Sequence, residues 1–436
     1  MTQTFDGLWA GLWAILSSNV IVAVLTFATL ALTSRALAPA GLGLLVLIEA
    51  YGRLFDQILR LEPTQALIRL ATDQKNNPDG APFRRLIKFG ILLDVAGSVL
   101  AATAAILLLP FVGGWFGFDD TGSGLVLLFC LTLLVPAPMT ARALLRLFDR
   151  FSLYARINVA TALLRLAGTV LLYWLGAEIQ HFVILLCAVS LFERLAPSVV
   201  CWPILQRASG RGVMATPLRG LLGENTGLWR FIWAANLSVL ARGSTRQFDV
   251  PILSGFVGLT EIGLYVLAKR FAMLLIRVGS PVQLVVYPRM CELVSRGDSA
   301  RIAQFVTAMM VCFASLSVVG LAVFYLIGTP LVATVFGAEF TAAVPLILVQ
   351  LVGACLLLMG TILNSALQAV RREGQLLTIS VIAALLFFLP IPILVPAYGI
   401  IAACYLFAGV GAIVVLGCAL SFRSALRASP QRPARE

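Results

Sequence analysis

The sequence predicts an all-α polytopic membrane protein of about twelve transmembrane helices in two six-helix lobes. Three observations lead to this fold class: the composition, the lengths of the apolar stretches, and the placement of basic residues between them. Of the 436 residues, 60% are hydrophobic and 12% are charged, and the mean hydropathy is +0.98. A soluble domain is about half apolar and about a quarter charged, so the composition indicates an integral membrane protein.

A helix that crosses the bilayer core needs roughly 20 mostly apolar residues. Stretches of this kind follow one another along the whole chain, and Pro390 and Pro392 leave the end of the eleventh the least defined. The twelve expected spans lie at about 9–34, 42–68, 86–110, 124–147, 153–175, 179–205, 229–255, 261–288, 301–328, 341–370, 374–394 and 397–422.

Basic residues fill every second gap between these spans. Twenty-two of them lie in the gaps 69–88, 142–156, 207–230, 289–301 and 371–372 and after residue 422, whereas Arg35 is the single base in the opposite gaps. Lys and Arg are retained on the cytoplasmic side during insertion, so we expect both termini in the cytoplasm. The spread over many loops favours anionic lipid headgroups as neighbours of these bases and argues against a nucleic-acid partner.

The second half of the chain echoes the first at an offset near 220 residues. Gly11-Leu12-Trp13 corresponds to Gly227-Leu228-Trp229, and Gly43-Leu44 corresponds to Gly263-Leu264. Two halves that enter the membrane the same way round form a parallel repeat, which is a transporter architecture with its substrate site between the halves. We expect an N-terminal lobe at 1–205, a cytoplasmic linker at 206–228, a C-terminal lobe at 229–422 and a basic cytoplasmic tail at 423–436.

Ionisable residues inside the spans are the most specific functional signal. The second span carries four of them, spaced so that all share one stripe of the helix. A charge at bilayer depth costs at least about 2.5 kcal/mol, so this stripe has to line a water-filled cavity or pair with other charges. Pairing between neighbours three or four residues apart is the simpler alternative. The pairs that the spacing allows are Glu49–Arg53, Asp56–Arg60 and Arg246–Asp249.

Pairing alone does not balance these charges, because nine bases inside the spans face five acids, or six with Glu62. Surplus arginine suits an anionic substrate, since guanidinium binds phosphate bidentately and stays charged when desolvated. Three amides either donate to a sugar headgroup or join helices to one another. The candidate substrate-binding residues are Arg53, Arg60, Arg242, Arg246, Lys269, Arg270, Arg277, Asn19, Asn236 and Gln283. The candidates for coupling or gating are Glu49, Asp56, Asp94 and Asp249, and Glu49 aligns with Lys269 in the repeat, so these two are expected to pair when the lobes close.

Three segments carry a resemblance to a known family. The stretch 249–270, DVPILSGFVGLTEIGLYVLAKR, is similar to the pattern D-x7-L/V-G-x-x-E-x-G-x-Y-x-x-A of polysaccharide flippases. The turn 35–44 resembles their R-x-L-G-P-x-x-Y-G-x segment, although Ala38 and Leu42 stand where glycine and an aromatic residue are usual, and 368–374 resembles the turn after their tenth span. The chain thus resembles the O-antigen and exopolysaccharide flippases of the multidrug/oligosaccharidyl-lipid/polysaccharide exporter (MOP) superfamily.

This resemblance implies a MATE-like bundle and an undecaprenyl-diphosphate-linked oligosaccharide as substrate. The glycan would move from the cytoplasmic to the periplasmic leaflet of a bacterial inner membrane by alternating access through a cationic cavity. Coupling to a proton or sodium gradient or to membrane potential is typical of the superfamily. Membrane lipids and polysaccharide assembly proteins are the expected partners, and a monomer is the default state.

Other readings stay open. A multidrug exporter would share the fold, but its mostly cationic substrates would be repelled by arginine; a lipid II flippase usually has fourteen spans. A membrane-embedded glycan polymerase or glycosyltransferase is a different class, and Asp119-Asp120 would be its acids, although the loop 111–123 is short for an acceptor site. One histidine and singly scattered cysteines give no metal-ligand spacing, so we expect no metal, no cofactor and no enzyme activity.

Overall fold

The computed structural model describes residues 2–60, 64–73, 80–210, 212–224, 227–230, 232–233, 236–237, 247–279, 281–295, 299–370 and 372–428. Every regular element in these ranges is helical, which confirms the all-α prediction. The chain forms two compact units: unit 1 comprises residues 1–37 and 44–243, and unit 2 comprises residues 38–43 and 244–436. The predicted lobe boundaries stay predictions.

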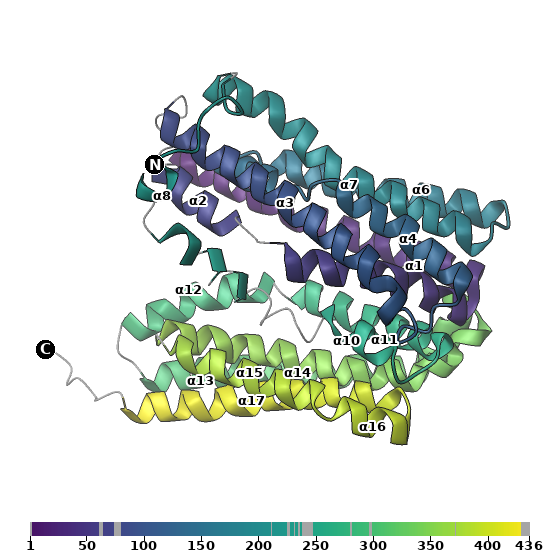
Figure 1. Cartoon of the computed structure of the whole chain (residues 1–436). Coiled ribbons are helices and arrows are strands. Elements are labelled where there is room, and N and C mark those ends of the chain that lie inside the picture. The colour runs from purple at the N-terminus through teal and green to yellow at the C-terminus, as the bar shows by residue number, and fades with distance from the viewer. Residues whose placement is uncertain are drawn as a thin grey trace, which may run out of the picture. The chain divides into compact units, whose positions relative to one another are not determined.

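Unit 1 is built from nine helical elements in the described residues (Figure 1). They are α1 (Thr2–Leu59), α2 (Thr64–Asp73), α3 (Ala81–Val112), α4 (Asp120–Leu131), the 3-10 helix η1 (Thr132–Leu134), α5 (Met139–Leu147), α6 (Phe151–Trp174), α7 (Ile179–Ser209) and α8 (Leu221–Glu224).

Unit 2 adds a second set of helices to the segment 38–43 of α1. They are α10 (Asp249–Leu253), α11 (Leu259–Gly279), α12 (Pro281–Ser295), α13 (Ser299–Phe336), the 3-10 helix η2 (Ala338–Ala343), α14 (Val344–Ala369), α15 (Glu373–Phe388), α16 (Ile391–Tyr398) and α17 (Ile401–Ala428).

Seven of the described helices are long and apolar enough to cross a membrane, or nine when each of two bent pairs counts as one span. Helix α1 contains the first predicted span and most of the second, and the two are divided by a break at Ala38 (φ 54°, ψ 178°). The second span was predicted to run to 68, but α1 ends at Leu59 and α2 begins at Thr64. The eighth predicted span corresponds to α11 and α12. The seventh, 229–255, lies partly outside the described residues, and its end contains α10.

The two bent pairs fall where proline interrupts a predicted span. The fourth span divides into α4 with η1 and α5, which meet at 44° around Pro136 and Pro138, and the eleventh divides into α15 and α16, which meet at 42° at Pro390. Proline has no N–H to donate and its ring clashes with the preceding turn, so the helix ends there. The last helix continues to Ala428, which places part of the predicted basic tail on α17.

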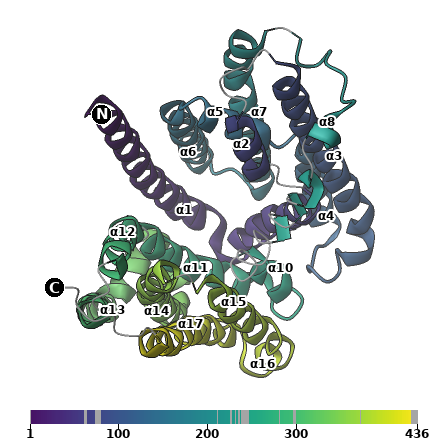
Figure 2. The ribbon, with the colours of Figure 1, turned by 90° about the vertical axis from the view of Figure 1, so that its left-hand side faces the viewer.

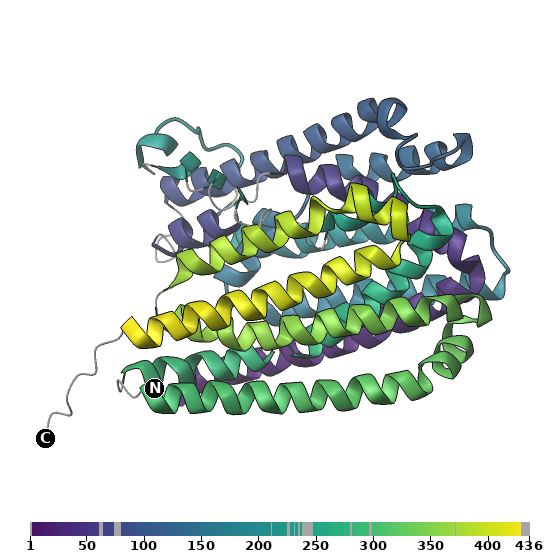
Figure 3. The ribbon, with the colours of Figure 1, turned by 90° about the horizontal axis from the view of Figure 1, so that it is seen from below.

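Each unit has its own apolar core. In unit 1, Leu86, Leu144 and Leu205 bring α3, α5 and α7 together in one buried cluster. In unit 2, α14 lies among α11, α12, α13 and α17, and missing side chains at Gly353 and Gly411 allow α14 and α17 to approach closely (Figure 2). Helix α13 lies along the edge of this unit and exposes large apolar residues such as Leu326, as a lipid-facing helix does (Figure 3).

Candidate functional site

A carboxylate on α1 binds two arginines from different helices. Glu49 is 9% exposed, and its Oε1 lies 2.6 Å from Arg53 one turn along α1 and 3.4 Å from Arg165 on α6. The first pair is the one that the i,i+4 spacing predicts, and it is confirmed. The second crosses between helices. The side chain of Arg53 remains 61% exposed although it is ion-paired.

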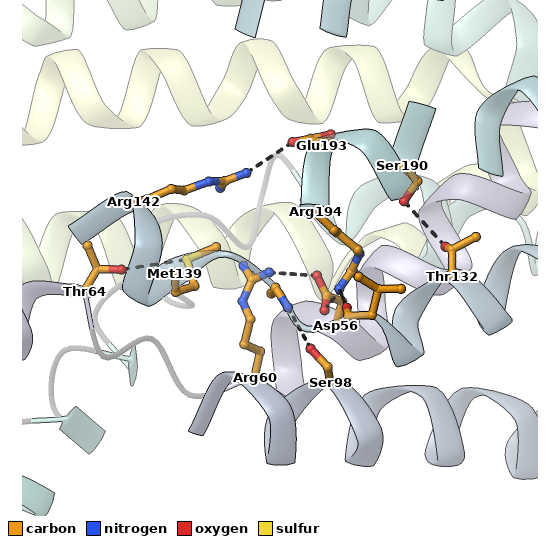
Figure 4. A network of polar contacts seen from close by, with 12 residues as sticks. Asp56, Arg60, Thr64, Ser98, Thr132, Met139, Arg142, Ser190, Glu193 and Arg194 are labelled. Atoms are coloured by element: carbon orange, nitrogen blue, oxygen red, sulfur yellow. Dashed lines mark hydrogen bonds and ion pairs between the residues drawn. The ribbon is translucent and has the colours of Figure 1, made fainter. Parts of the chain in front are cut away.

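Two turns further along α1, Asp56 repeats this arrangement (Figure 4). Its Oδ2 lies 2.8 Å from Arg60, which confirms the second predicted pair, and its Oδ1 lies 3.0 Å from Arg194 on α7. Four guanidinium groups therefore meet two carboxylates in these ion pairs, so the cluster of Glu49, Asp56 and their partners carries two positive charges in excess.

The break in the fourth span is held by side chains from two other helices. Ser98 Oγ accepts a hydrogen bond from the Ala137 N–H at 2.9 Å, and Asp94 Oδ2 accepts one from the Thr140 N–H at 2.8 Å. Arg194 donates to the Val135 carbonyl at 2.9 Å. Proline removed the regular helical bonds here, and these buried partners replace them, as a backbone in lipid requires.

Arg142 extends the polar network toward α7 and α6. Its guanidinium lies 3.4 Å from Glu193 and 5.9 Å from the ring centroid of Tyr154, which is a cation–π distance. The sequence analysis placed Arg142 among the bases of a cytoplasmic loop. Nothing in the spacing of those bases indicated that Arg142 would contact an acid on another span.

Unit 2 contains a second buried charge cluster. Asp249 is 2% exposed and accepts a hydrogen bond from Lys269 at 2.6 Å, from the Tyr265 hydroxyl at 2.8 Å and from the Val250 N–H at 2.8 Å. Its predicted partner, Arg246, lies outside the described residues. Tyr265 was missed as a site residue, although the E-x-G-x-Y segment that contains it was a signal.

The remaining candidates are less tightly placed. Arg270 and Arg277 lie on α11, where Arg277 is exposed and both make contacts with neighbouring residues. Asn19 is exposed on α1, and Asn236 is 4% exposed. Gln283 lies on α12 with its side chain outside the description, and Arg242 lies outside the described residues. The pairing of Glu49 with Lys269 stays a prediction.

The predicted periplasmic acids have a local role in the helix that follows them. Asp119 is the N-cap of α4, and its Oδ1 accepts the Gly122 N–H at 2.6 Å. Asp120 lies exposed in the first turn, where a carboxylate interacts favourably with the helix dipole. Among the residues that the structure describes, no three His, Cys, Asp or Glu side chains gather as metal ligands do.

Comparison with known proteins identifies relatives of this chain. A family model described as polysaccharide biosynthesis protein matches residues 32–345. The inner membrane protein YghQ of Escherichia coli (strain K12) is 25% identical over 338 residues, which are 76% of this chain and 93% of YghQ.

Solved structures share the fold at low identity. An inward-facing multidrug resistance MATE family transporter of the MOP superfamily aligns with a TM-score of 0.73 at 14% identity, over 97% of this chain and 99% of that one. The lipid II flippase MurJ in an inward closed conformation aligns with a TM-score of 0.66 at 13% identity, over 96% of this chain and 89% of MurJ. The predicted twelve-helix MATE-like fold class is confirmed. Because the family model covers well over half of its length, the chain belongs to the polysaccharide biosynthesis protein family.

Proposed function

We propose that this protein is a flippase that moves an undecaprenyl-diphosphate-linked oligosaccharide from the cytoplasmic to the periplasmic leaflet of a bacterial inner membrane. Family membership supports a transporter in polysaccharide biosynthesis. The relative YghQ is named an inner membrane protein, and MurJ, which shares the fold, is a lipid II flippase. Both termini would lie in the cytoplasm, and transport would proceed by alternating access.

The observation that carries the proposal is the charge excess of the cluster in unit 1. Each of its two carboxylates is shared by two guanidiniums, so these ion pairs contain two more bases than acids. The other acids nearby are Glu193, which pairs with Arg142, and Asp94, which makes no ion pair among the described residues. Ion pairing between neighbours would give one base per acid. A diphosphate would supply the missing negative charge, and arginine recognises its oxygens through paired N–H donors that remain charged in a dry environment.

Arg53 is the best placed of the four to meet a substrate. Its side chain is 61% exposed, whereas those of Arg60, Arg165 and Arg194 are 20%, 28% and 9% exposed. Glu49 retains Arg165 when Arg53 is removed, so Arg53→Gln leaves this buried carboxylate with a basic partner. The variant therefore tests substrate binding with little disturbance of folding.

The test is translocation of a polyprenyl-diphosphate oligosaccharide in proteoliposomes. Loss of one charge-assisted hydrogen bond of about 1.5–3 kcal/mol predicts that Arg53→Gln slows translocation by about 10- to 150-fold. Arg289→Gln is the matched control, because Arg289 is 53% exposed and pairs with Glu292 one turn away on α12. Its rate is expected to remain close to that of the unaltered protein.

Equal rates in the Arg53 variant and the unaltered protein would contradict the role of the cluster. Absence of lipid movement together with efflux of organic cations would favour the drug-exporter alternative.

A further inference from the structure

Two buried side-chain oxygen atoms at the break in the fourth span take part in none of its hydrogen bonds. Asp94 on α3 is 4% exposed, and Thr140 at the start of α5 is 2% exposed. Asp94 Oδ2 accepts the Thr140 N–H, but Asp94 Oδ1 and Thr140 Oγ1 are buried without a hydrogen-bond partner among the described residues. Buried polar atoms are nearly always satisfied, so two in one place indicate that a ligand belongs between the helices here.

The backbone of α3 brings the two residues together. Gly90 lies one turn before Asp94, and a Cβ there would lie 2.8 Å from Thr140 Oγ1. The missing side chain therefore lets the threonine hydroxyl rest against α3 on the face that carries Asp94. One turn further along α3, Gly97 has no side chain, so the chain just after α1 can approach closely. The Cα of Arg60 lies 3.3 Å from where a Cβ of residue 97 would be.

The charges around Asp94 restrict what the ligand is. Arg60 and Arg142 are the charged groups close enough to act on this carboxyl group, and both are cations. Asp94 makes no ion pair among the described residues, so neither arginine contacts it directly. Other charged residues on the helices that pack against α3 are Arg69 and Asp73 on α2, Asp120 on α4, Arg146 on α5 and Glu224 on α8. Arg194 on α7 reaches the break and holds Asp56, with Glu193 beside it, and α3 itself carries Arg84, Arg85 and Lys88.

These surroundings suit a proton better than a metal ion. A hard metal cation takes about six or more oxygen ligands, and two nearby guanidiniums would repel it. A proton needs a single acceptor oxygen and one neighbour. A protonated carboxyl group also avoids an unpaired negative charge inside the membrane, which is expensive.

We propose that Asp94 and Thr140 form a proton-binding site in the break of the fourth span. A hydronium ion transfers its proton to Asp94 Oδ1, which forms an O–H bond and releases one water molecule. This O–H donates to Thr140 Oγ1, while Oδ2 continues to accept the Thr140 N–H. The N-terminus of α5 and Arg142 stabilise the carboxylate once the proton leaves, so the site can exist in both states.

The site has a consequence for transport that rests on the proposed function. Because Asp94 and Ser98 on α3 and Arg194 on α7 hold the same break, loss of the proton changes the charge at a joint between three helices. If the chain is the flippase proposed above, the proton at Asp94 is the ion whose gradient drives it.

Infrared spectroscopy of the purified full chain tests the site without any substrate. At about pH 7, well above the range in which exposed carboxyl groups titrate, the spectrum of the unaltered protein minus that of Asp94→Asn is expected to contain a carboxylic-acid C=O band. Thr140→Val is expected to shift this band to higher frequency, because the hydrogen bond that the carboxyl O–H donates to the threonine hydroxyl is lost. Asp120→Asn is the control, and the band remains in it.

A difference spectrum without the band, or a band that Thr140→Val leaves in place, would overturn the site. If Asp94→Asn does not fold, as judged by size-exclusion chromatography, the Thr140→Val shift alone decides.

Transport separates this proposal from the proposed function. The ratio of translocation rates with and without a pH gradient is expected to exceed unity in the unaltered protein and to fall to unity in Asp94→Asn. Lipid movement that a pH gradient never changes would overturn the coupling role only, whereas no movement by the unaltered protein would overturn the flippase.

Discussion

Gly43 and Gly263 lie in reciprocal contact: each glycine packs against the backbone that carries the other. A Cβ on Gly43 would overlap the carbonyl oxygen of Leu259, and a Cβ on Gly263 would overlap that of Pro39. The segment 38–43 and α11 both belong to unit 2, so this crossing is part of its packing. The two glycines also occupy matching positions in the predicted repeat, at the start of the second and eighth spans.

Alanine at either glycine is expected to destabilise the protein. The added methyl group would overlap a backbone oxygen rather than the end of a flexible side chain, so the helices have to separate, at a cost of about 1–3 kcal/mol or more. Thermal unfolding in detergent measures the loss for Gly43→Ala and Gly263→Ala. Gly409→Ala on α17 is the control, because a Cβ there meets no atom within 4 Å and stability is expected to stay the same or rise slightly. Equal unfolding temperatures in all three variants would contradict the close crossing.

Glycine in place of Ala38 is expected to stabilise the protein. Ala38 has φ 54° and ψ 178°, a combination that is accessible almost exclusively to glycine and that costs other residues about 1–3 kcal/mol. Ala38→Gly relieves this strain and should raise the unfolding temperature, even though glycine gives the unfolded chain more freedom. Ala40→Gly, two residues on in the first turn after the break, is the control and should lower stability by up to about 0.5–1 kcal/mol. If Ala38→Gly lowers stability as much as the control, the strain is absent.

The sequence already predicted the features that depend on local geometry. Helical spacing sets Glu49 beside Arg53 and Asp56 beside Arg60, and both pairs occur. Glycine is usual at position 38 in the family that the turn resembles, and the positive φ of Ala38 supplies the physical reason. Proline likewise explains why two predicted spans are bent.

Contacts between residues on helices far apart in the chain could not be predicted from the sequence. Arg165 is 116 residues from Glu49, and its contact depends on how α6 packs against α1. The surplus of bases indicated an excess of positive charge, but tertiary packing decides that two bases share one acid. For the same reason, Asp249 contacts Lys269, twenty residues away, through the approach of α10 to α11.

Arg194 is expected to matter more for stability than Arg60, although both bind Asp56. Arg194 is 9% exposed at its side chain and also donates to the Val135 carbonyl in the broken span. Arg194→Met leaves this carbonyl unsatisfied and should cost about 2–3 kcal/mol. Arg60→Met removes a more exposed group and leaves Arg194 on Asp56, so about 1 kcal/mol is expected. Thermal unfolding of the two variants in one detergent provides the comparison, and the reverse order would show that the break does not depend on Arg194.

The buried pair of Asp249 and Lys269 is expected to behave as a unit. Asp249→Asn leaves an ammonium group without its acid, and Lys269→Met leaves a 2% exposed carboxylate without its base, so each change should cost about 3–5 kcal/mol. The double variant is expected to cost less than the sum by about 1–3 kcal/mol, measured by thermal unfolding in a double-mutant cycle. Tyr265→Phe is the control, because it removes one hydrogen bond and no charge, at about 1 kcal/mol. Additive losses would show that the pair contributes nothing beyond its separate charges. Translocation by the double variant then separates the role of the pair in stability from a role in transport. If the double variant is stable but does not move lipid, the pair acts in the transport cycle, because loss of stability cannot explain the defect.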